Sequence, residues 1–405
     1  GWSSFNSNQA WSDINPGPDL TIPRNHRIAD TFTASTTAAP PSVDPLVLDL
    51  DNDGIETVGL NAASPLMFDI DASGVKKSVG WLKGDDGFLV RDLNGNGLID
   101  SGAELFGDAT ALTAGGKAAD GFSALADLDS NRDGKIDSLD SQFANLRLWR
   151  DLNQDGISQS NELATLTEAG IASLNVASTS HSTQLTNGNQ IADLGTYTKI
   201  GGQLGSLGET AQSGDINLAV DTFHTQFTDH LDTRSVDTLP DMQGAGQVRN
   251  LREAASISSE LLTLLTQFAS ATRSTQQTLI DSILKAWSAT STMNTTFNGA
   301  YAGHELSVNI QNISGPAYQA WQDKLTILEH FNGRTFNTVP SGNGAVTVNL
   351  WTTTQDLLQQ SYEALKGSVY QSYEALKGSV YQSLALQTRL KGYLDQISLN
   401  VTENG

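Results

Sequence analysis

Two acidic segments of twelve residues constrain this chain more than any other feature of its sequence. Each places oxygen-bearing side chains at positions 1, 3, 5, 9 and 12 and a glycine at position 6. A hard cation such as Ca²⁺ takes roughly six to eight oxygen ligands, and the glycine permits the sharp turn that wraps the chain around the ion. The pattern therefore predicts two calcium loops of the EF-hand kind.

The first loop runs from Asp129 to Asp140, and the second runs from Asp151 to Glu162. Position 7 supplies a main-chain carbonyl in such loops, and a glutamate at position 12 ligates with both oxygens. The expected ligands are Asp129, Asn131, Asp133, Lys135, Asp137, Asp140, Asp151, Asn153, Asp155, Ile157, Gln159 and Glu162. The apolar spacing from Leu139 to Trp149 predicts a helix that leaves the first loop and enters the second.

Three related segments precede these loops and depart from the pattern. The segment from Asp92 follows a predicted strand, residues 87–90, and its glutamate comes one residue late. The segment from Asp49 has Leu60 at position 12, and the segment from Asp69 is weaker still. The expected ligands here are Asp92, Asn94, Asn96, Leu98, Asp100, Glu104, Asp49, Asp51 and Asp53. For an isolated segment, an Asx turn is the alternative interpretation.

The negative charge of the chain is concentrated around these loops. Residues 44–169 hold 23 Asp or Glu and 9 Lys or Arg, a net charge of −14 out of −22 for all 405 residues. This balance argues against a nucleic-acid partner, because little would neutralise phosphates, and it favours cations. Without bound ions the like charges repel one another, so we expect the calcium-free form to be loosely folded.

Residue content excludes several other chemistries. There is no cysteine, so disulfides, a thiolate nucleophile and a cysteine zinc site are excluded. The six histidines show no HExxH spacing, and neither a GxSxG nor a phosphate-loop motif is present. No apolar run is long enough to span a membrane, and the first residues lack a signal peptide. We expect the chain to be a piece of a longer protein whose export signal lies elsewhere.

The sequence pattern predicts an α+β fold in four regions. Residues 1–43, rich in Ser, Thr and Pro, are expected to be an extended leader or linker, and residues 44–175 a calcium module of EF-hand-like loops, short strands and helix pairs. Residues 176–235 alternate polar and apolar residues around turns, which indicates a small β region or connector. Helical spacing predicts a mostly α-helical domain over residues 236–405. Within it, an eleven-residue segment, QSYEALKGSVY, occurs twice in succession.

An Asp-Pro bond, Asp44-Pro45, stands directly before the first acidic segment. On its own it is ordinary turn chemistry. Its context is more specific, because DPLVLDLDNDGIET is followed by GFLVRDLNGNGLIDSGAELFGD and then by the two complete loops. Over residues 44–175 these motifs resemble, in kind and order, the calcium-dependent self-processing module of the iron-regulated RTX (Frp-type) proteins of Gram-negative bacteria. Asn52, where relatives commonly have Gly, and the late Glu104 depart from that pattern.

The resemblance implies a function. In that family calcium triggers autocatalytic cleavage of the Asp-Pro bond, and the freed Asp can then be joined to a lysine of another protein. Carried over, Asp44 and Pro45 are the reacting residues, Ca²⁺ is the cofactor, and a lysine-bearing protein is the acceptor. The resemblance also implies an extracellular location reached by type I secretion. The acidic positions of the family's calcium region fall on Asp129, Asp140, Asp151 and Glu162.

The residues suit this chemistry. An Asp carboxylate can attack its own main-chain carbonyl to give a five-membered cyclic anhydride, with the high effective molarity of an intramolecular reaction. Proline forms a tertiary amide with only a slight trans preference, so a fold could twist it and improve the leaving group. Nearby Asp49 and Glu56 are candidates for the proton donor. The alternative function is a non-catalytic, calcium-stabilised folding or adhesion module in which Asp44-Pro45 is merely a domain edge.

Overall fold

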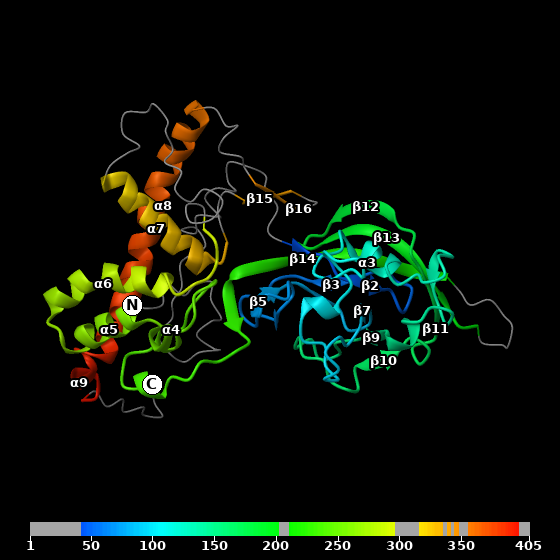
Figure 1. Cartoon of the computed structure of the whole chain (residues 1–405), viewed down its shortest axis with the longest axis horizontal. Coiled ribbons are helices and arrows are strands. Elements are labelled where there is room, and N and C mark those ends of the chain that lie inside the picture. The colour runs from blue at the N-terminus through cyan, green and yellow to red at the C-terminus, as the bar shows by residue number, and fades with distance from the viewer. Residues whose placement is uncertain are drawn as a thin grey trace, which may run out of the picture. The chain divides into compact units, whose positions relative to one another are not determined.

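The chain divides into two units, each described here by itself (Figure 1). The computed structural model describes residues 42–201, 210–295, 316–334, 338–341, 344–347 and 355–396. Of these, residues 42–221 and 225–228 form the first unit, and residues 222–224 and 229–396 belong to the second. The predicted leader, residues 1–43, lies outside the described residues except for its last two.

Among the described residues, the first unit is built on a sheet of twelve antiparallel strands. Its main path has the order β10-β9-β7-β2-β14-β13-β11-β8, while β1 and β5 pair with β14, β4 with β5 and β12 with β13. β3 and β6 form a separate pair. The strands are β1 (Ser42–Val43), β2 (Leu46–Leu48), β3 (Thr57–Val58), β4 (Met67–Phe68), β5 (Val75–Val79), β6 (Trp81–Leu82), β7 (Gly87–Val90), β8 (Lys135–Ile136), β9 (Arg147–Trp149), β10 (Leu163–Thr165), β11 (Ile171–Asn175), β12 (Thr179–Gln184), β13 (Gln190–Lys199) and β14 (Thr210–Phe227).

The short apolar strand β2 lies inside this sheet between β7 and β14. Successive side chains of a strand point to opposite faces, and here both faces are covered. Leu46 and Leu48 enter a core on one face, whereas Val47 enters a second core on the other. A continuous run of apolar residues is therefore needed at β2, and the segment directly after Asp44-Pro45 is among the most buried of the described chain.

The second core contains a cluster of four aromatic side chains, Phe68, Trp81, Phe88 and Trp149. Their contacting ring centroids lie between 4.7 and 5.8 Å apart. Both indoles also reach an acidic loop: Trp81 Nε1 donates to Asp151 Oδ2 at 2.8 Å, and Trp149 Nε1 donates to Glu162 Oε2 at 3.4 Å. The first and last acidic residues of one predicted calcium loop are thus attached directly to the core.

The predicted α+β module with helix pairs is wrong. Residues 139–149 form only the 3-10 turn η4 (Phe143–Asn145) and then strand β9, which pairs with β7 and β10. A short apolar run cannot distinguish strand from helix, and here the neighbouring strands decide. The helical elements of the described part of this unit are η3 (Gly102–Glu104), α3 (Gly121–Ala126) and η4.

The small β region predicted for residues 176–235 is not a separate element of the fold. β12, β13 and most of β14 extend the same sheet, and β14 pairs with β2 through Ser213↔Leu48, Gly214↔Val47 and Asp215↔Leu46. Alternating polarity identified these residues as strands. It could not identify their partners, because β2 lies more than 160 residues earlier in the sequence.

The second unit is mostly helical. Its elements are η5 (Arg234–Val236), α4 (Leu251–Ile257), α5 (Ser259–Ser270), α6 (Arg273–Ser288), α7 (Pro316–Asn332), β15 (Thr338–Ser341), β16 (Gly344–Thr347), α8 (Gln355–Gln387) and α9 (Lys391–Leu394). The repeated eleven-residue segment lies within α8, where Val369 and Val380, eleven positions apart, are both fully buried. Eleven residues make almost three helical turns, so the duplication preserves the apolar face. Among the described helices, none combines the length and apolar character that crossing a membrane requires.

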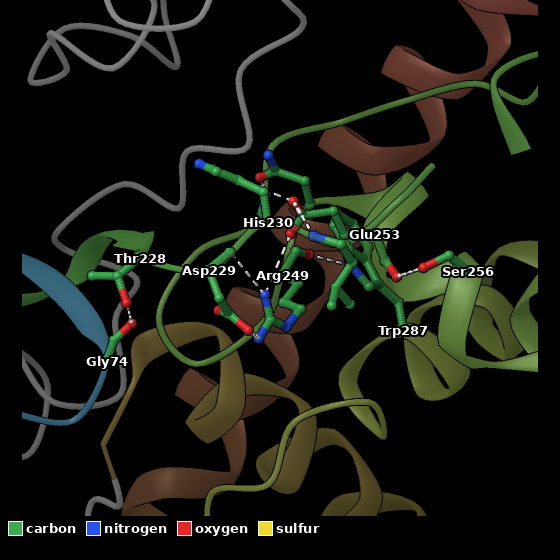
Figure 2. A network of polar contacts seen from close by, with 11 residues as sticks. Gly74, Thr228, Asp229, His230, Arg249, Glu253, Ser256 and Trp287 are labelled. Carbon is green, nitrogen blue, oxygen red and sulfur yellow. Dashed lines mark hydrogen bonds and ion pairs between the residues drawn. The ribbon is translucent and has the colours of Figure 1, made fainter. Parts of the chain in front are cut away.

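Polar contacts fix the chain around α4 (Figure 2). Arg249 Nη2 donates to both carboxylate oxygens of Asp229 at 2.8 Å, and Trp287 Nε1 donates to the carbonyl of Arg249 at 2.8 Å. In the first unit, Thr228 Oγ1 donates to the carbonyl of Gly74 at 2.8 Å, which holds the chain after β14 against the start of β5.

The aromatic cluster gives a test of the fold. Replacing Trp81 by Ala removes a fully buried ring and the donor to Asp151, so we expect the free energy of unfolding to fall by about 3–5 kcal/mol. Urea denaturation in the presence of Ca²⁺, followed by circular dichroism, measures this change. Leu139→Ala is the control, because Leu139 is 73% exposed and its loss should matter little. Equal stability of the two variants would contradict the described core.

Candidate functional site

All five acidic segments share one backbone conformation. The residue at position 4 has a positive φ in each, and so does the glycine at position 6. At position 4 these are Asn52 (69°), Ala72 (55°), Gly95 (72°), Arg132 (60°) and Gln154 (56°). Asparagine tolerates this conformation better than most residues, so Asn52 adopts it at low cost. The weakest motif, which starts at Asp69, is therefore a loop of the same shape.

In the two complete loops, the first and last acids accept hydrogen bonds from the loop backbone. Asp151 accepts from the amides of Asp155 and Gly156, at 3.2 and 2.9 Å. Glu162 accepts from the amides of Leu152 and Gln159, at 2.9 and 3.2 Å. Asp129 and Asp140 make the equivalent contacts in the first loop. The acid at position 12 thus ties the start of each loop to its end.

Glu104 makes the same contacts despite its late position. Its oxygens accept from the amides of Leu93 and Asp100, at 3.0 and 2.9 Å. These are positions 2 and 9 of the loop that starts at Asp92, the same two positions that Glu162 contacts in its own loop. The extra residue is accommodated in the 3-10 turn η3, so Glu104 closes this loop although it stands at position 13.

The loop that starts at Asp49 is closed by Asp86, a residue that the sequence analysis did not single out. Asp86 Oδ1 accepts from the amide of Leu50 at 3.2 Å, and its Oδ2 accepts from the amide of Glu56 at 3.0 Å. Burial raises the pKa of Asp86 to about 7. Ligand oxygens of Asp49, Asp51 and Asp86 lie within 4.8 Å of one another, so these three could hold a metal ion. The acid missing from position 12 comes from the turn before β7.

The loop that starts at Asp69 holds a lysine ammonium instead. Lys77 Nζ donates to both carboxylate oxygens of Asp71 at 2.8 Å, to Ser73 Oγ at 3.0 Å and to the carbonyl of Val75 at 3.4 Å. These acceptors are positions 3, 5 and 7 of the loop, where a calcium ion would find its ligands. Lys77 is buried, so this loop carries its own cation.

The donor sets of the other four loops suit a hard cation, because all consist of carboxylate, amide and carbonyl oxygens. The ammonium of Lys135, at position 7, pairs with Asp137 at 2.9 Å, so only the main-chain carbonyl of Lys135 could ligate a cation. Amide side chains of Asn96, Asn153 and Gln159 donate to neighbouring loop carboxylates at 2.9–3.0 Å. The remaining predicted ligands, Asn94, Leu98, Asn131, Asp133, Asp53 and Ile157, lie within the same loops and are exposed or partly exposed.

The Asp44-Pro45 bond lies between β1 and β2 and is held from two sides. The amide of Ile216 in β14 donates to the carbonyl of Pro45 at 3.2 Å, and the amide of Leu46 donates to the carbonyl of Phe106 at 2.8 Å. Pro45 is buried, whereas Asp44 is partly exposed. The bond is thus placed at the entrance to the central strand of the sheet.

Gly107 and Asp108, which follow Glu104 in the sequence, contact Asp44 closely. The amide of Asp108 donates to Asp44 Oδ1 at 2.7 Å. A Cβ on Gly107 would lie 2.4 Å from the Asp44 carbonyl oxygen, 3.0 Å from its carbonyl carbon and 3.2 Å from Oδ1, so only glycine fits here. Burial, and next the negative charge of Asp108, raise the pKa of Asp44 to about 8. A cavity of about 10 Å³ beside Asp44 and Pro45 has room for about one water.

Both proton-donor candidates predicted from the sequence have partners other than this bond. Asp49 accepts the amides of Asn52 and Gly54 within its own loop, at 2.8 and 3.1 Å. Glu56 pairs with Lys83 at 2.9 Å. The contacts of Gly107 and Asp108 with Asp44 were also missed, because no short-range motif connects residues more than 60 positions apart.

Comparison with known proteins bears on both the bond and the loops. Residues 46–213 match the family described as SPM domain, so the match begins directly after Pro45. Over 382 residues the chain is 38% identical to the iron-regulated protein FrpA of Neisseria meningitidis serogroup C. The aligned region covers 88% of this chain and 32% of that protein, so the chain spans about a third of its relative. Residues 46–213 are therefore similar to an SPM domain, and the similarity over most of the chain is consistent with a module of an Frp-type protein, the resemblance that its motifs had indicated.

Proposed function

We propose that the chain cleaves its own Asp44-Pro45 bond when its acidic loops are loaded with Ca²⁺, and that Asp44 can then be transferred to a lysine of an acceptor protein. The observation that carries this proposal is the position of Gly107, which faces both the carbonyl carbon and the carboxyl oxygen of Asp44. Together with the Asp108 amide, it confines the nucleophile and the electrophile of one residue to a single packed site.

The reaction begins with the Asp44 carboxylate. One of its oxygens attacks the Asp44 carbonyl carbon, the bond to the Pro45 nitrogen breaks, and a five-membered anhydride remains. Because burial and the negative charge of Asp108 raise the pKa of Asp44, less of this group is ionised at neutral pH than of an ordinary aspartate. Opening of the anhydride by water gives simple cleavage, and opening by a lysine amine gives an isopeptide bond. The cavity beside Asp44 admits about one water, so an acceptor lysine has to approach from outside it.

The loops act through the segment that follows Glu104. Calcium, when bound, neutralises loop carboxylates and so lowers the repulsion within them. Asp49, Asp51 and Asp86 would hold one ion, and the loops starting at Asp92, Asp129 and Asp151 would hold others. Closure of the Asp92 loop fixes Glu104, and the next residues are Leu105 to Asp108, which contact Asp44 and Leu46. The amide of Gly102 also donates to the Asp69 carbonyl at 2.7 Å, which joins the neighbouring loop to this segment.

We place this activity outside the cell, with export by type I secretion, because a precursor in a calcium-poor cytosol would stay intact. This location rests on the relationship to Frp-type proteins and on the calcium requirement, which would separate synthesis from reaction.

The first prediction concerns the bond itself. The chain purified in chelator is expected to stay whole and, after addition of millimolar Ca²⁺, to yield fragments that end at Asp44 and begin at Pro45. Asp44→Asn should remain intact, because an amide is a poor nucleophile here. Intact-mass spectrometry measures both. A wild-type chain that gains structure with Ca²⁺ but stays whole would leave the calcium-stabilised folding or adhesion module as its function.

The second prediction tests the grip on Asp44. Gly107→Ala places a methyl group 2.4 Å from the Asp44 carbonyl oxygen, so the site must shift. A displacement of this kind typically costs about a hundredfold in rate, and we expect that loss with little change in calcium affinity. The control is Gly378→Ala, since a Cβ at Gly378 meets nothing within 4 Å. Cleavage of the Gly107 variant at the wild-type rate would contradict the proposed positioning.

The third prediction concerns Asp86. Asp86→Asn removes one carboxylate from the group with Asp49 and Asp51, so calcium binding measured by titration calorimetry should lose its site at this loop or weaken there about tenfold or more. Glu168→Gln is the matched control, because it also removes one negative charge but is exposed and lies outside the loops. Identical calcium titrations for the two variants would remove Asp86 from the ligand set.

A further inference from the structure

Breaking the bond to Pro45 requires a proton on its nitrogen, and an acid other than Asp49 and Glu56 is placed to supply one. Asp215 lies in β14 directly opposite Leu46 of β2. Side chains of directly paired residues share a face of the sheet, and so do residues two apart on one strand. Asp215 therefore shares its face with Leu46. β1 pairs with β14 in the same register as β2, so the side chains keep alternating between the two faces from Val43 to Leu46. Asp44, two residues before Leu46, therefore lies on the same face as Asp215.

The backbone also brings Asp215 next to the bond. The residue after it, Ile216, donates its amide to the carbonyl of Pro45 at 3.2 Å. A Cβ on Gly121 would lie 3.0 Å from Asp215 Oδ1, 3.0 Å from Leu46 Cβ and 2.9 Å from the Phe106 carbonyl oxygen. The carboxyl of Asp215 is thus packed among the same segments that hold Asp44-Pro45.

The environment of Asp215 favours its protonated form. Its side chain is 1% exposed, and Oδ1 is buried without a hydrogen-bond partner among the described residues. Burial of a carboxylate oxygen without a hydrogen-bond partner disfavours the ionised form relative to the neutral acid. Burial first, and then the negative charges of Asp44, Asp120 and Asp193, raise the pKa of Asp215 to about 9, while the Gly121 amide lowers it in part.

We propose that the carboxyl of Asp215 is the acid that protonates the nitrogen of Pro45. This inference rests on the proposed self-cleavage and adds its missing proton donor. As the Asp44 carboxylate oxygen bonds to the carbonyl carbon, the carbon–nitrogen bond breaks and its electron pair stays on the Pro45 nitrogen. That nitrogen takes the Asp215 proton and becomes a neutral secondary amine. The negative charge that began on Asp44 ends on Asp215, and a proton released when water opens the anhydride returns to it.

The rate should follow a bell-shaped dependence on pH. The reactive form has Asp44 ionised and Asp215 protonated, so the rate rises as the pair loses its first proton and falls as it loses its second. Both limbs should lie well above the range of an ordinary carboxyl, because burial raises the pKa of both groups. Because Asp44 and Asp215 interact, the two apparent pKa values of the pH profile describe the pair and are not assigned to the individual residues. The other charged groups facing them are Asp108, Asp120 and Asp193, all acidic.

The test measures cleavage rates of the full chain in saturating Ca²⁺ between pH 6 and 10 for wild type, Asp215→Asn and Asp215→Glu. Loss of a general acid typically costs about a hundredfold or more, so the Asn variant should slow by at least that factor and lose the alkaline limb. The Glu variant should cleave faster than the Asn variant and show a shifted alkaline limb. Asp193→Asn is the control, because Asp193 pairs across from Asp215 but carries no transferred proton.

Calcium-induced tryptophan fluorescence, which Trp81 and Trp149 should report, verifies folding of each variant. A folded Asn variant that cleaves at the wild-type rate with an unchanged alkaline limb would overturn the role of Asp215 and leave self-cleavage standing. If the Asp215→Asn variant does not fold, the Asp215→Glu variant provides the test. An alkaline limb of its pH profile at the same pH as in the wild type would mean that a group other than residue 215 donates the proton. Failure of the wild type to cleave would instead refute the proposed function.

Discussion

The pairing of β2 with β14 is the constraint on which the rest of the first unit depends. It places Leu46 to Leu48 in the middle of the sheet, with one hydrophobic core on each face. Because the strand is only three residues long, the bond before it cannot move away from the sheet without breaking those contacts. β14 also places the amide of Ile216 at the carbonyl of Pro45 and places Asp215 directly opposite Leu46. The hydrophobic core therefore fixes the position of the polar site.

The acidic residues of the first unit fall into two groups that differ in their environment. The loop acids are satisfied by backbone amides at the sheet's periphery and suit a cation that cancels their charge. Among the ion pairs of the described residues, none involves Asp44 or Asp215, and burial raises the pKa of both. A cation held by the loops would favour the folded state, in which Asp215 is buried and Asp44 is partly buried. Under the proposed function, the loops would then act on the bond through folding, without a calcium ion touching the reacting atoms.

Local spacing predicted the features that lie within about fourteen residues of one another. Asp151, Gly156 and Glu162 occupy the places that a calcium loop requires, and the structure shows the late Glu104 in the same place. Spacing could not predict Asp86 or Gly107, whose partners lie in other loops and strands. It also misassigned residues 139–149, because LRLW becomes a strand only beside β7. The reason is physical. The periodicity of apolar side chains reports local structure, whereas strand pairing joins segments that are far apart in the sequence.

Lys77 shows how the same loop shape can serve stability without an ion. Its ammonium contacts positions 3, 5 and 7 of the Asp69 loop, and its stem is buried in β5. That loop meets the segment leading to Gly107 through the Asp69 carbonyl and the Gly102 amide. One side of the Asp44 site is therefore held by a loop that contains its own lysine ammonium, whereas the proposed function assigns Ca²⁺ to the other loops. Under the proposed function, only part of the framework around the bond would then depend on calcium, because the Asp69 loop is already closed by Lys77.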